Sequence, residues 1–238
     1  MGRAIEFRTS MIDDLRLEDD TGKGLPIRFS NQEFRKMFDL AKLSKNDVFY
    51  DLGSGWGQAL IIAITEYHVK QAVGIERDLE RQMVSNSRLR RRKLDGQARI
   101  VPGNFDDLYS DKLPGASLSE PSVIFYGLTT DDELITAMRK KARPGCRLIY
   151  YFNGLFPEIK AEEVDFPFFV SKVPFKKPKS EHDWLNSILR KKESSLGRRG
   201  RPSVKELWDE LTHDYDAYSE DTSDVAYYKR KLKQVIAS

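Results

Sequence analysis

The chain has 238 residues, of which 39% are hydrophobic and 32% are charged, and its formal net charge is +3. This composition is typical of a globular protein, and the length suffices for one sizeable domain with its own core. The chain holds no apolar run near the roughly 20 residues that span a membrane. Its one cysteine, Cys146, and its three scattered histidines argue against a disulfide framework and against a zinc site.

Helical signals recur along the chain from residue 30. Ser30 with Glu33 predicts a capping box at the start of a helix, and Thr130 with Glu133 predicts a second one. Pro144 is expected to end the helix that follows Thr130. Two further helical segments are predicted at 58–67 and 78–96.

Apolar runs alternate with these helices and predict strands at 48–52, 71–76, 98–103, 121–127, 146–152 and 165–173. Strands separated by helices of this length form a parallel sheet with helices on both faces. The remainder of the chain changes character from residue 186. A stretch with seven Lys/Arg and one Glu is followed, over 206–224, by eight acidic residues. Such charge blocks predict a basic linker and a charged helical tail, and a solvated appendage is the simplest interpretation.

The sequence DLGSGWGQ follows the first predicted strand and carries glycines at 53, 55 and 57. Glycines in such a strand–turn–helix let a ligand lie directly against backbone N–H groups. A phosphate loop would need a lysine after the last glycine, and a dinucleotide fingerprint spaces its glycines differently. Asp51, just before the turn, would repel a pyrophosphate and favour a cationic ligand. Glu76 ends the second predicted strand and suits the two hydroxyls of a ribose, so the pattern indicates S-adenosylmethionine.

DLGSGWGQ and VGIE, some twenty residues later, resemble the first two motifs of class I methyltransferases. More narrowly, the chain is similar to the non-SET histone lysine methyltransferases of the disruptor-of-telomeric-silencing family and to their archaeal protein-lysine methyltransferase relatives. The similarity continues at 34–55, 103–107, 121–127 and 172–184, and it covers roughly residues 25–192. It implies an α/β, Rossmann-like seven-stranded sheet with helices on both faces, followed by a C-terminal helical tail.

The resemblance divides the chain into an N-terminal segment with a substrate/cofactor loop (1–29), an S-adenosylmethionine-dependent methyltransferase domain (30–192), and a basic linker with a charged helical tail (193–238). It also implies the residues that bind the cofactor: Asp51, Gly53, Ser54, Gly55, Gln58, Glu76, Arg77, Asn104 and Phe105. Within this set, the resemblance implies that Asp51, Gly53, Gly55 and Gln58 hold the methionine end. Glu76 would bind the ribose, and Asn104 with Phe105 the adenine. An aspartate is usual where this chain has Asn104, and the eukaryotic branch has two asparagines in place of Gly127 and Leu128.

The implied activity is methyl transfer from S-adenosylmethionine to the side-chain amine of a lysine in a protein, either a histone or another DNA-associated basic protein. An apolar, aromatic channel would lower the pKa of the acceptor lysine by desolvation. Tyr126 and Trp184 are the catalytic candidates for this channel, with Phe152 beside them, and core packing remains an equal alternative for each. Trp56, inside the turn, is expected to be half-exposed and to cover the cofactor.

The linker carries Arg198, Arg199 and Arg201 in a segment that resembles the core of an AT-hook. Such arginines could contact DNA, although a basic linker without a partner remains an alternative. We expect a monomer without membrane contact that is intracellular, in the cytoplasm or nucleoid of an archaeon or the nucleus of a eukaryote. Two other functions stay open: an RNA or small-molecule methyltransferase of the same fold, and a DNA- or chromatin-binding module with a vestigial cofactor pocket. An intact Asp51/Glu76 pair argues against the second.

Overall fold

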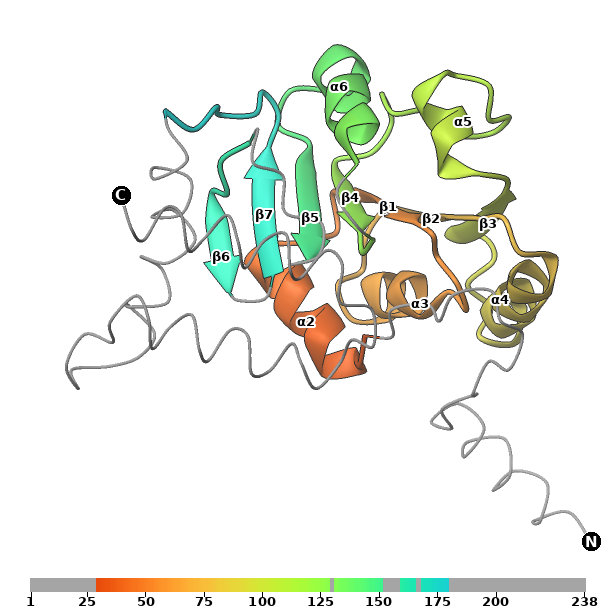
Figure 1. The fold of residues 1–238 in the computed structure, drawn as a ribbon. Helices are drawn as coiled ribbons and strands as arrows, with labels where there is room; N and C mark the ends of the chain where they lie inside the picture. The colour runs from red at the N-terminus through yellow and green to blue at the C-terminus, as the bar shows by residue number, and fades with distance from the viewer. Residues whose placement is uncertain (1–28, 129–130, 152–158, 166–167, 180–238) are drawn as a thin grey trace, which may run out of the picture.

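The structure, a computed structural model, describes residues 29–128, 131–151, 159–165 and 168–179. These residues form one sheet of seven strands: β1 (Val48–Leu52), β2 (Gln71–Glu76), β3 (Ala98–Pro102), β4 (Val123–Tyr126), β5 (Arg147–Tyr151), β6 (Glu163–Asp165) and β7 (Phe168–Lys172). The strands lie in the order β3-β2-β1-β4-β5-β7-β6 (Figure 1). The first five in this order are parallel, whereas β7 is antiparallel to β5 and β6. The predicted seven-stranded Rossmann-like sheet is confirmed, whereas the parallel direction predicted for its strands is wrong for β7, which follows β6 without an intervening helix.

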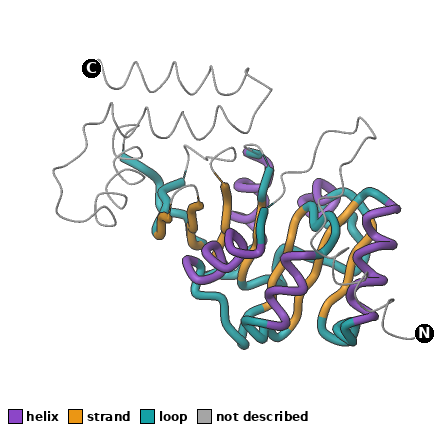
Figure 2. The backbone as a smooth tube through the Cα atoms, turned by 90° about the horizontal axis from the view of Figure 1, so that it is seen from below, coloured by secondary structure: helices purple, strands orange, loops and turns teal. Residues whose placement is uncertain are grey.

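Both faces of the sheet are covered by helices, as predicted. The described helices are α2 (Asn31–Leu40), α3 (Gln58–Thr65), α4 (Leu79–Arg91), α5 (Phe105–Tyr109) and α6 (Asp132–Lys141). Helices α2, α3 and α4 lie on one face, and α5 and α6 lie on the other (Figure 1, Figure 2). Each face has its own hydrophobic cluster, so the core consists of two layers, one on each side of the sheet.

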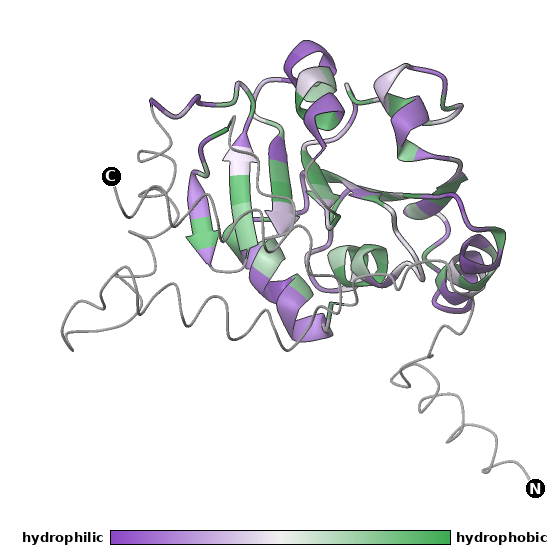
Figure 3. Cartoon of the chain, viewed as in Figure 1, coloured by the Kyte–Doolittle hydropathy of each residue, from purple (hydrophilic) through white to green (hydrophobic). Residues whose placement is uncertain are grey.

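The side chains of β1 alternate between these two layers. Phe49 belongs to the cluster beneath α2 and α3, whereas Tyr50 and Leu52 belong to the cluster beneath α5 and α6. Because successive residues of a strand point to opposite faces, Asp51 lies on the same side as Phe49. Helix α3 has six buried residues out of eight, and it is hydrophobic like the central strands, whereas α2 and α4 carry many hydrophilic residues (Figure 3).

Several local predictions are confirmed and some are wrong. The capping box of Ser30 and Glu33 is present at the start of α2. The second predicted box is wrong because α6 is capped by Asp131, whose side chain accepts from the backbone N–H groups of Glu133 and Leu134. Helix α5 and strand β6 were not predicted. The linker and the helical tail predicted beyond residue 192 lie outside the described residues.

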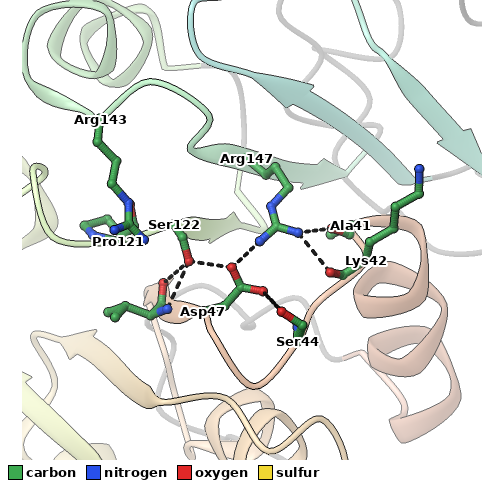
Figure 4. Close-up of polar contacts among 9 residues, drawn as sticks. Ala41, Lys42, Ser44, Asp47, Pro121, Ser122, Arg143 and Arg147 are labelled. Atoms are coloured by element: carbon green, nitrogen blue, oxygen red, sulfur yellow. Dashed lines mark hydrogen bonds and ion pairs between the residues drawn. The ribbon is translucent and has the colours of Figure 1, made fainter.

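The amino ends of β1, β4 and β5 are joined by a polar network around Asp47 (Figure 4). Asp47 is 5% exposed. Its carboxylate forms an ion pair with Arg147 and accepts hydrogen bonds from the Ser122 hydroxyl at 2.7 Å and from the Ser44 backbone N–H at 2.8 Å. Arg147 also donates to the carbonyl of Ala41, the C-cap of α2, at 2.6 Å. The network thus fixes α2 to the sheet at the edge where these parallel strands begin.

Candidate functional site

The opposite edge of the sheet, where the parallel strands end, carries the residues predicted to bind a ligand. From β1, the chain first adds β2 and β3 toward one edge of the sheet and then returns to add β4 and β5 on the other side of β1. The direction of strand addition therefore switches between β1 and β4. Ligands of open α/β sheets bind at such a switch point, outside the carboxyl ends of the strands. Asp51, Glu76 and Tyr126 all lie at these ends.

Three left-handed glycines shape the turn between β1 and α3. The angle φ is +86° at Gly53, +51° at Gly55 and +73° at Gly57, values that other residues rarely adopt. The backbone N–H groups of Gly53 and Ser54 both donate to the carbonyl of Ile75 on β2, at 3.0 Å. The turn is therefore a defined loop tied to the neighbouring strand, and it presents backbone rather than side chains.

Ser54 points beneath this turn, toward β2. Its side chain is 6% exposed, and its hydroxyl has no hydrogen-bond partner within the described residues. A Cβ atom built on Gly74 would lie 2.5 Å from Ser54 Oγ. Gly74 is thus required for the turn to pack against β2. This role was not predicted from the sequence. A glycine inside a strand was the available signal, because it marks a close approach of another backbone.

Two buried carboxylates border the turn, Asp51 with 4% and Glu76 with 5% of their surface exposed. Asp51 pairs with Gly74 across β1 and β2, so Glu76 lies two residues further along on the same face. In the described part of the chain, the Asp51 carboxylate has no hydrogen-bond or ion-pair partner. Burial, and next the negative charge of Glu76, raise the pKa of Asp51 to about 8. Both causes favour the neutral, protonated form of the Asp51 carboxyl group.

Glu76, in contrast, accepts backbone hydrogen bonds on both oxygens. Its Oε2 accepts from Gly55 N at 2.7 Å and its Oε1 accepts from Asp78 N at 2.9 Å. The carboxylate thereby ties the glycine turn to the start of α4. Each oxygen retains a second lone pair, which leaves capacity to accept the hydroxyls of a ribose. Arg77, also predicted to bind the cofactor, is exposed beside it.

Side chains of α4 hold the outer side of the turn. Ser85 Oγ donates to the Gly55 carbonyl at 2.7 Å, and Arg88 Nη1 donates to the Trp56 carbonyl at 2.8 Å. Trp56 itself is half-buried, as predicted. Sequence reasoning missed Ser85 and Arg88 because they follow the turn by about thirty residues and carry no motif.

The side chain of Gln58 bridges three helices. Its Oε1 accepts from Arg88 on α4, and its Nε2 donates to Asn31 Oδ1 on α2 at 2.8 Å. Both ends of the Gln58 amide are thus engaged within the protein. This residue was predicted to hold the methionine end of the cofactor, and its position on the first turn of α3 keeps it beside the glycine turn.

Asn104 and Phe105 follow β3, the strand next to β2. Asn104 is the N-cap of α5, and its Nδ2 donates to Asp106 Oδ2 at 2.7 Å. Its Oδ1 contact with Asp106 N is 3.5 Å long, so Oδ1 keeps acceptor capacity for an amine. The Phe105 ring packs edge-to-face on Tyr126, with ring centroids 5.8 Å apart. Asn104 and Phe105 therefore extend the edge that begins at Glu76.

Tyr126 lies at the end of β4 and is only 3% exposed. It belongs to the cluster beneath α5 and α6. Burial, and next the negative charge of Asp131, raise the pKa of its hydroxyl well above the usual range. Asp131 also accepts from the Tyr109 hydroxyl at 2.8 Å. The buried position favours core packing for Tyr126, whereas Phe152 and Trp184 lie outside the described residues.

An aromatic cluster lies on the other side of the switch point, at the ends of β4 and β5. The Phe29 ring contacts Phe125, Tyr151 and Phe168, with centroid separations of 5.5, 5.2 and 6.1 Å. These four residues are called the aromatic cluster below. A Cβ on Gly127 would come within 3.0 Å of Phe29, so this glycine lets the ring lie against the chain after β4. Sequence reasoning assigned no role to Phe29.

Leu128 stands between the aromatic cluster and the glycine turn. Its side chain is 36% exposed, and its Cδ1 would lie 3.9 Å from a Cβ built on Gly53. An apolar group thus borders the turn at a position where the eukaryotic branch of the resembling family has an asparagine.

Comparison with known proteins adds two matches by sequence. The family model described as "Histone methylation protein DOT1" matches residues 29–93. A protein-lysine N-methyltransferase of Saccharolobus islandicus (strain REY15A) is 33% identical over 136 residues, which cover 54% of this chain and 80% of that protein. The matched family region contains the glycine turn, both buried carboxylates and the two α4 residues that hold the turn.

A solved structure agrees with the fold. The RNA methyltransferase of Salinibacter ruber, in complex with S-adenosyl-L-homocysteine, has a TM-score of 0.56 and 20% sequence identity. The similarity covers 65% of this chain and 98% of that chain. At this identity the likeness concerns the fold alone.

Two absences concern the described residues. No helix there combines the length and the apolarity needed to cross a membrane. No three His, Cys, Asp or Glu side chains in that part of the chain gather where they could hold a metal ion. The expected lack of a metal stays a prediction.

Proposed function

Because the chain belongs to the DOT1-type family of protein-lysine N-methyltransferases, we propose that it methylates a lysine of a histone or of another basic, DNA-associated protein. The enzyme transfers a methyl group from S-adenosylmethionine to the side-chain amine of a protein lysine. The family relationship supports the reaction. The substrate protein and the roles of individual residues are proposed from the sequence and the geometry.

The observation that carries the proposed cofactor site is the buried pair of Asp51 and Glu76 beside the glycine turn. S-adenosylmethionine carries an ammonium group and a sulfonium group, and either cation would favour the ionised form of Asp51. Glu76 has free lone pairs for the ribose hydroxyls, and Asn104 Oδ1 can accept from the adenine amine. Glycines at 53 and 55 let the methionine end lie against backbone.

Methyl transfer to lysine depends mainly on how the amine nitrogen and the methyl group are positioned. The neutral lysine nitrogen attacks the methyl carbon as the carbon–sulfur bond breaks, and S-adenosylhomocysteine leaves with the electron pair of that bond. The lysine must first lose a proton, which at neutral pH costs about 4.6 kcal/mol from a reference pKa of about 10.4. In-line displacement of this kind is promoted by orientation and by electrostatic surroundings, so a catalytic triad is not needed.

We place the acceptor lysine beside the aromatic cluster, across Leu128 from the cofactor. Apolar surroundings disfavour the ammonium form of lysine, and aromatic faces stabilise a nearby sulfonium. Phe29 and Tyr151 are half-buried, so part of each ring remains accessible. Trp184 belongs to the same proposal, whereas the role we propose for Tyr126 is to support the Phe105 ring from the core.

Replacement of Glu76 by alanine tests the cofactor site. The change removes two charge-assisted hydrogen bonds to the ribose, each worth about 1.5–3 kcal/mol. We therefore expect S-adenosylmethionine affinity, measured by calorimetry, to fall at least about a hundredfold. Glu80→Ala removes an exposed carboxylate from the first turn of α4 and serves as the matched control. Equal cofactor affinity in the two variants would contradict the assignment.

The substrate class is tested by incubating the enzyme with tritiated cofactor and cell extract. Label should appear on lysines of basic proteins, and mass spectrometry should identify them. Trp184→Ala is expected to lower turnover much more than cofactor affinity, since this residue would lie on the acceptor side. Label on RNA or on small metabolites instead would show that the proposed substrate is wrong while the reaction type stands.

We also propose that the enzyme is an intracellular monomer and contacts DNA through Arg198, Arg199 and Arg201, within the tail predicted over 193–238. Arginines in a basic linker bind phosphates in a salt-dependent manner. The full-length chain with all three replaced by alanine should therefore shift DNA less than the unchanged chain in gels at low salt. Identical shifts would argue against this contact.

A further inference from the structure

The glycine turn needs to be held in place from outside itself. Glycine loses more backbone freedom on folding than other residues, and three glycines within five positions leave the turn many alternative conformations. A ligand that lies against this backbone binds best when the backbone already has its bound shape. The Ile75 carbonyl and the Glu76 carboxylate fix the side of the turn nearest β2.

The opposite side is fixed by α4. Ser85 is fully buried, and its hydroxyl binds the Gly55 carbonyl. The helix touches the turn here, because a Cβ on Gly57 would lie 3.2 Å from Ser85 Oγ. One turn further along α4, Arg88 binds the next carbonyl, that of Trp56. Two consecutive carbonyls of the turn are thus directed toward α4.

We infer that Ser85 and Arg88 are positioning residues for the cofactor, which hold the Gly55 and Trp56 carbonyls against α4 and so fix the backbone that receives the methionine end. This inference rests on the proposed role of the turn. It extends the site to two side chains on a helix to which the sequence analysis assigned no role in cofactor binding.

The guanidinium of Arg88 makes two hydrogen bonds that a lysine side chain could not both make. Its Nη1 donates to the Trp56 carbonyl while its Nη2 donates to Gln58 Oε1. Gln58 in turn donates to Asn31, so the fork connects α4 to α3 and α2 around the turn. A planar fork binds two acceptors at once, whereas an ammonium group is a single point of charge on a flexible stem.

Substitution of Arg88 by methionine tests the inference in the full-length enzyme. Methionine keeps helix propensity and aliphatic length but removes both donors. We expect the KM for S-adenosylmethionine to rise about tenfold, the effect of one or two lost hydrogen bonds, with kcat at saturating cofactor changed less than about threefold. Arg90→Met is the matched control, since Arg90 is exposed two residues further along the same helix.

Two milder variants keep the inference testable if Arg88→Met does not fold. Arg88→Lys retains the charge but not the fork, and Ser85→Ala removes one hydrogen bond. Each should raise the cofactor KM about threefold, by less than Arg88→Met. A role limited to helix packing would lower the melting temperature of these variants while leaving the cofactor KM equal to that of Arg90→Met, and this result would overturn the inference.

Calorimetry of S-adenosylmethionine binding, on the unchanged enzyme and on each variant, separates this inference from the proposed site. If Glu76→Ala weakens S-adenosylmethionine binding but Arg88→Met and Ser85→Ala do not, the inference fails and the proposed site stands. If none of the three variants affects binding, the proposed site fails as well. Weaker binding in all three, with Arg90→Met unchanged, supports both.

Discussion

A buried aspartate lies at each end of β1, and the two carboxylates differ in the polar partners that surround them. Asp47, at the amino end, is 5% exposed, and Asp51, at the carboxyl end, is 4% exposed. Asp47 forms an ion pair with Arg147 and accepts from Ser122 and Ser44. Asp51 has no such partner within the described residues, and the charge that acts on it, that of Glu76, has the same sign.

The difference separates a carboxylate that is compensated within the protein from one for which we propose a ligand as the partner. A buried charge is tolerated when it is paired and hydrogen-bonded. Asp47 meets this condition inside the protein and connects α2 to the sheet. Asp51 does not meet it, which is why its pKa rises to about 8. Perturbed carboxyl groups of this kind gather at functional sites, and we attribute that of Asp51 to a cationic cofactor.

The largest effect on stability is expected when Asp47, the aspartate that is paired within the protein, loses its partner. Arg147→Met removes the ion-pair partner of Asp47 and the hydrogen bond to Ala41. Because an uncompensated charge is then left buried, we expect the free energy of unfolding to fall by about 3–5 kcal/mol, measured by urea denaturation.

The double variant Asp47→Asn/Arg147→Met is the control for this change, because it removes the unpaired charge along with its partner. It should recover part of the lost stability. A loss below about 0.5 kcal/mol in Arg147→Met, the level of an ordinary surface substitution, would show that the pair is not structural.

A smaller change in stability, of opposite sign, is expected when Asp51, the aspartate at the other end of β1, is replaced. The pKa of Asp51 is raised from 3.8 to about 8, so the protonated form stabilises the folded state. That contribution is complete below pH 4 and is lost as the pH rises through 8. Asp51→Asn cannot ionise, so the ligand-free variant should be more stable than the unchanged enzyme at pH 8.5, with little difference at pH 4.

The same variant should bind cofactor more weakly. The loss should be larger for S-adenosylmethionine than for S-adenosylhomocysteine, because the sulfide lacks the sulfonium charge. Equal stability of variant and unchanged enzyme at pH 8.5, together with equal losses for both ligands, would mean that Asp51 is compensated after all.

The smallest effect concerns the strand beneath the turn. Gly74→Ala places a Cβ 2.5 Å from Ser54 Oγ, so the turn must shift. Overpacking of this kind costs about 1–3 kcal/mol, and we expect a loss near the lower end, accompanied by a several-fold rise in the cofactor KM. Ser54→Gly, added to Gly74→Ala, removes the colliding side chain and should restore the KM. If Gly74→Ala alone leaves the KM unchanged, the turn does not depend on this contact.

Much of the carboxyl edge could be predicted from the sequence because its signals are local. Strand β2 was predicted with its observed bounds, and the glycine turn follows directly from the spacing of Gly53, Gly55 and Gly57. An acidic residue in the last two positions of a predicted strand lies at the carboxyl edge of the sheet, so the positions of Asp51 and Glu76 could be predicted from the sequence, whereas their binding role stays a prediction. The capping box of α2 has the same local origin.

Other features were decided only when distant segments came together. Ser85 and Arg88 reach the turn across about thirty residues, and the Asp47–Arg147 pair spans one hundred. No spacing rule predicts such contacts, because they depend on how α4 and β5 pack against β1. The burial of individual side chains was likewise decided only by the tertiary structure. Asp47 and Asp51 are the same residue type on one short stretch of chain, and only the tertiary structure supplies one with an arginine and buries the other without a hydrogen-bond or ion-pair partner among the described residues.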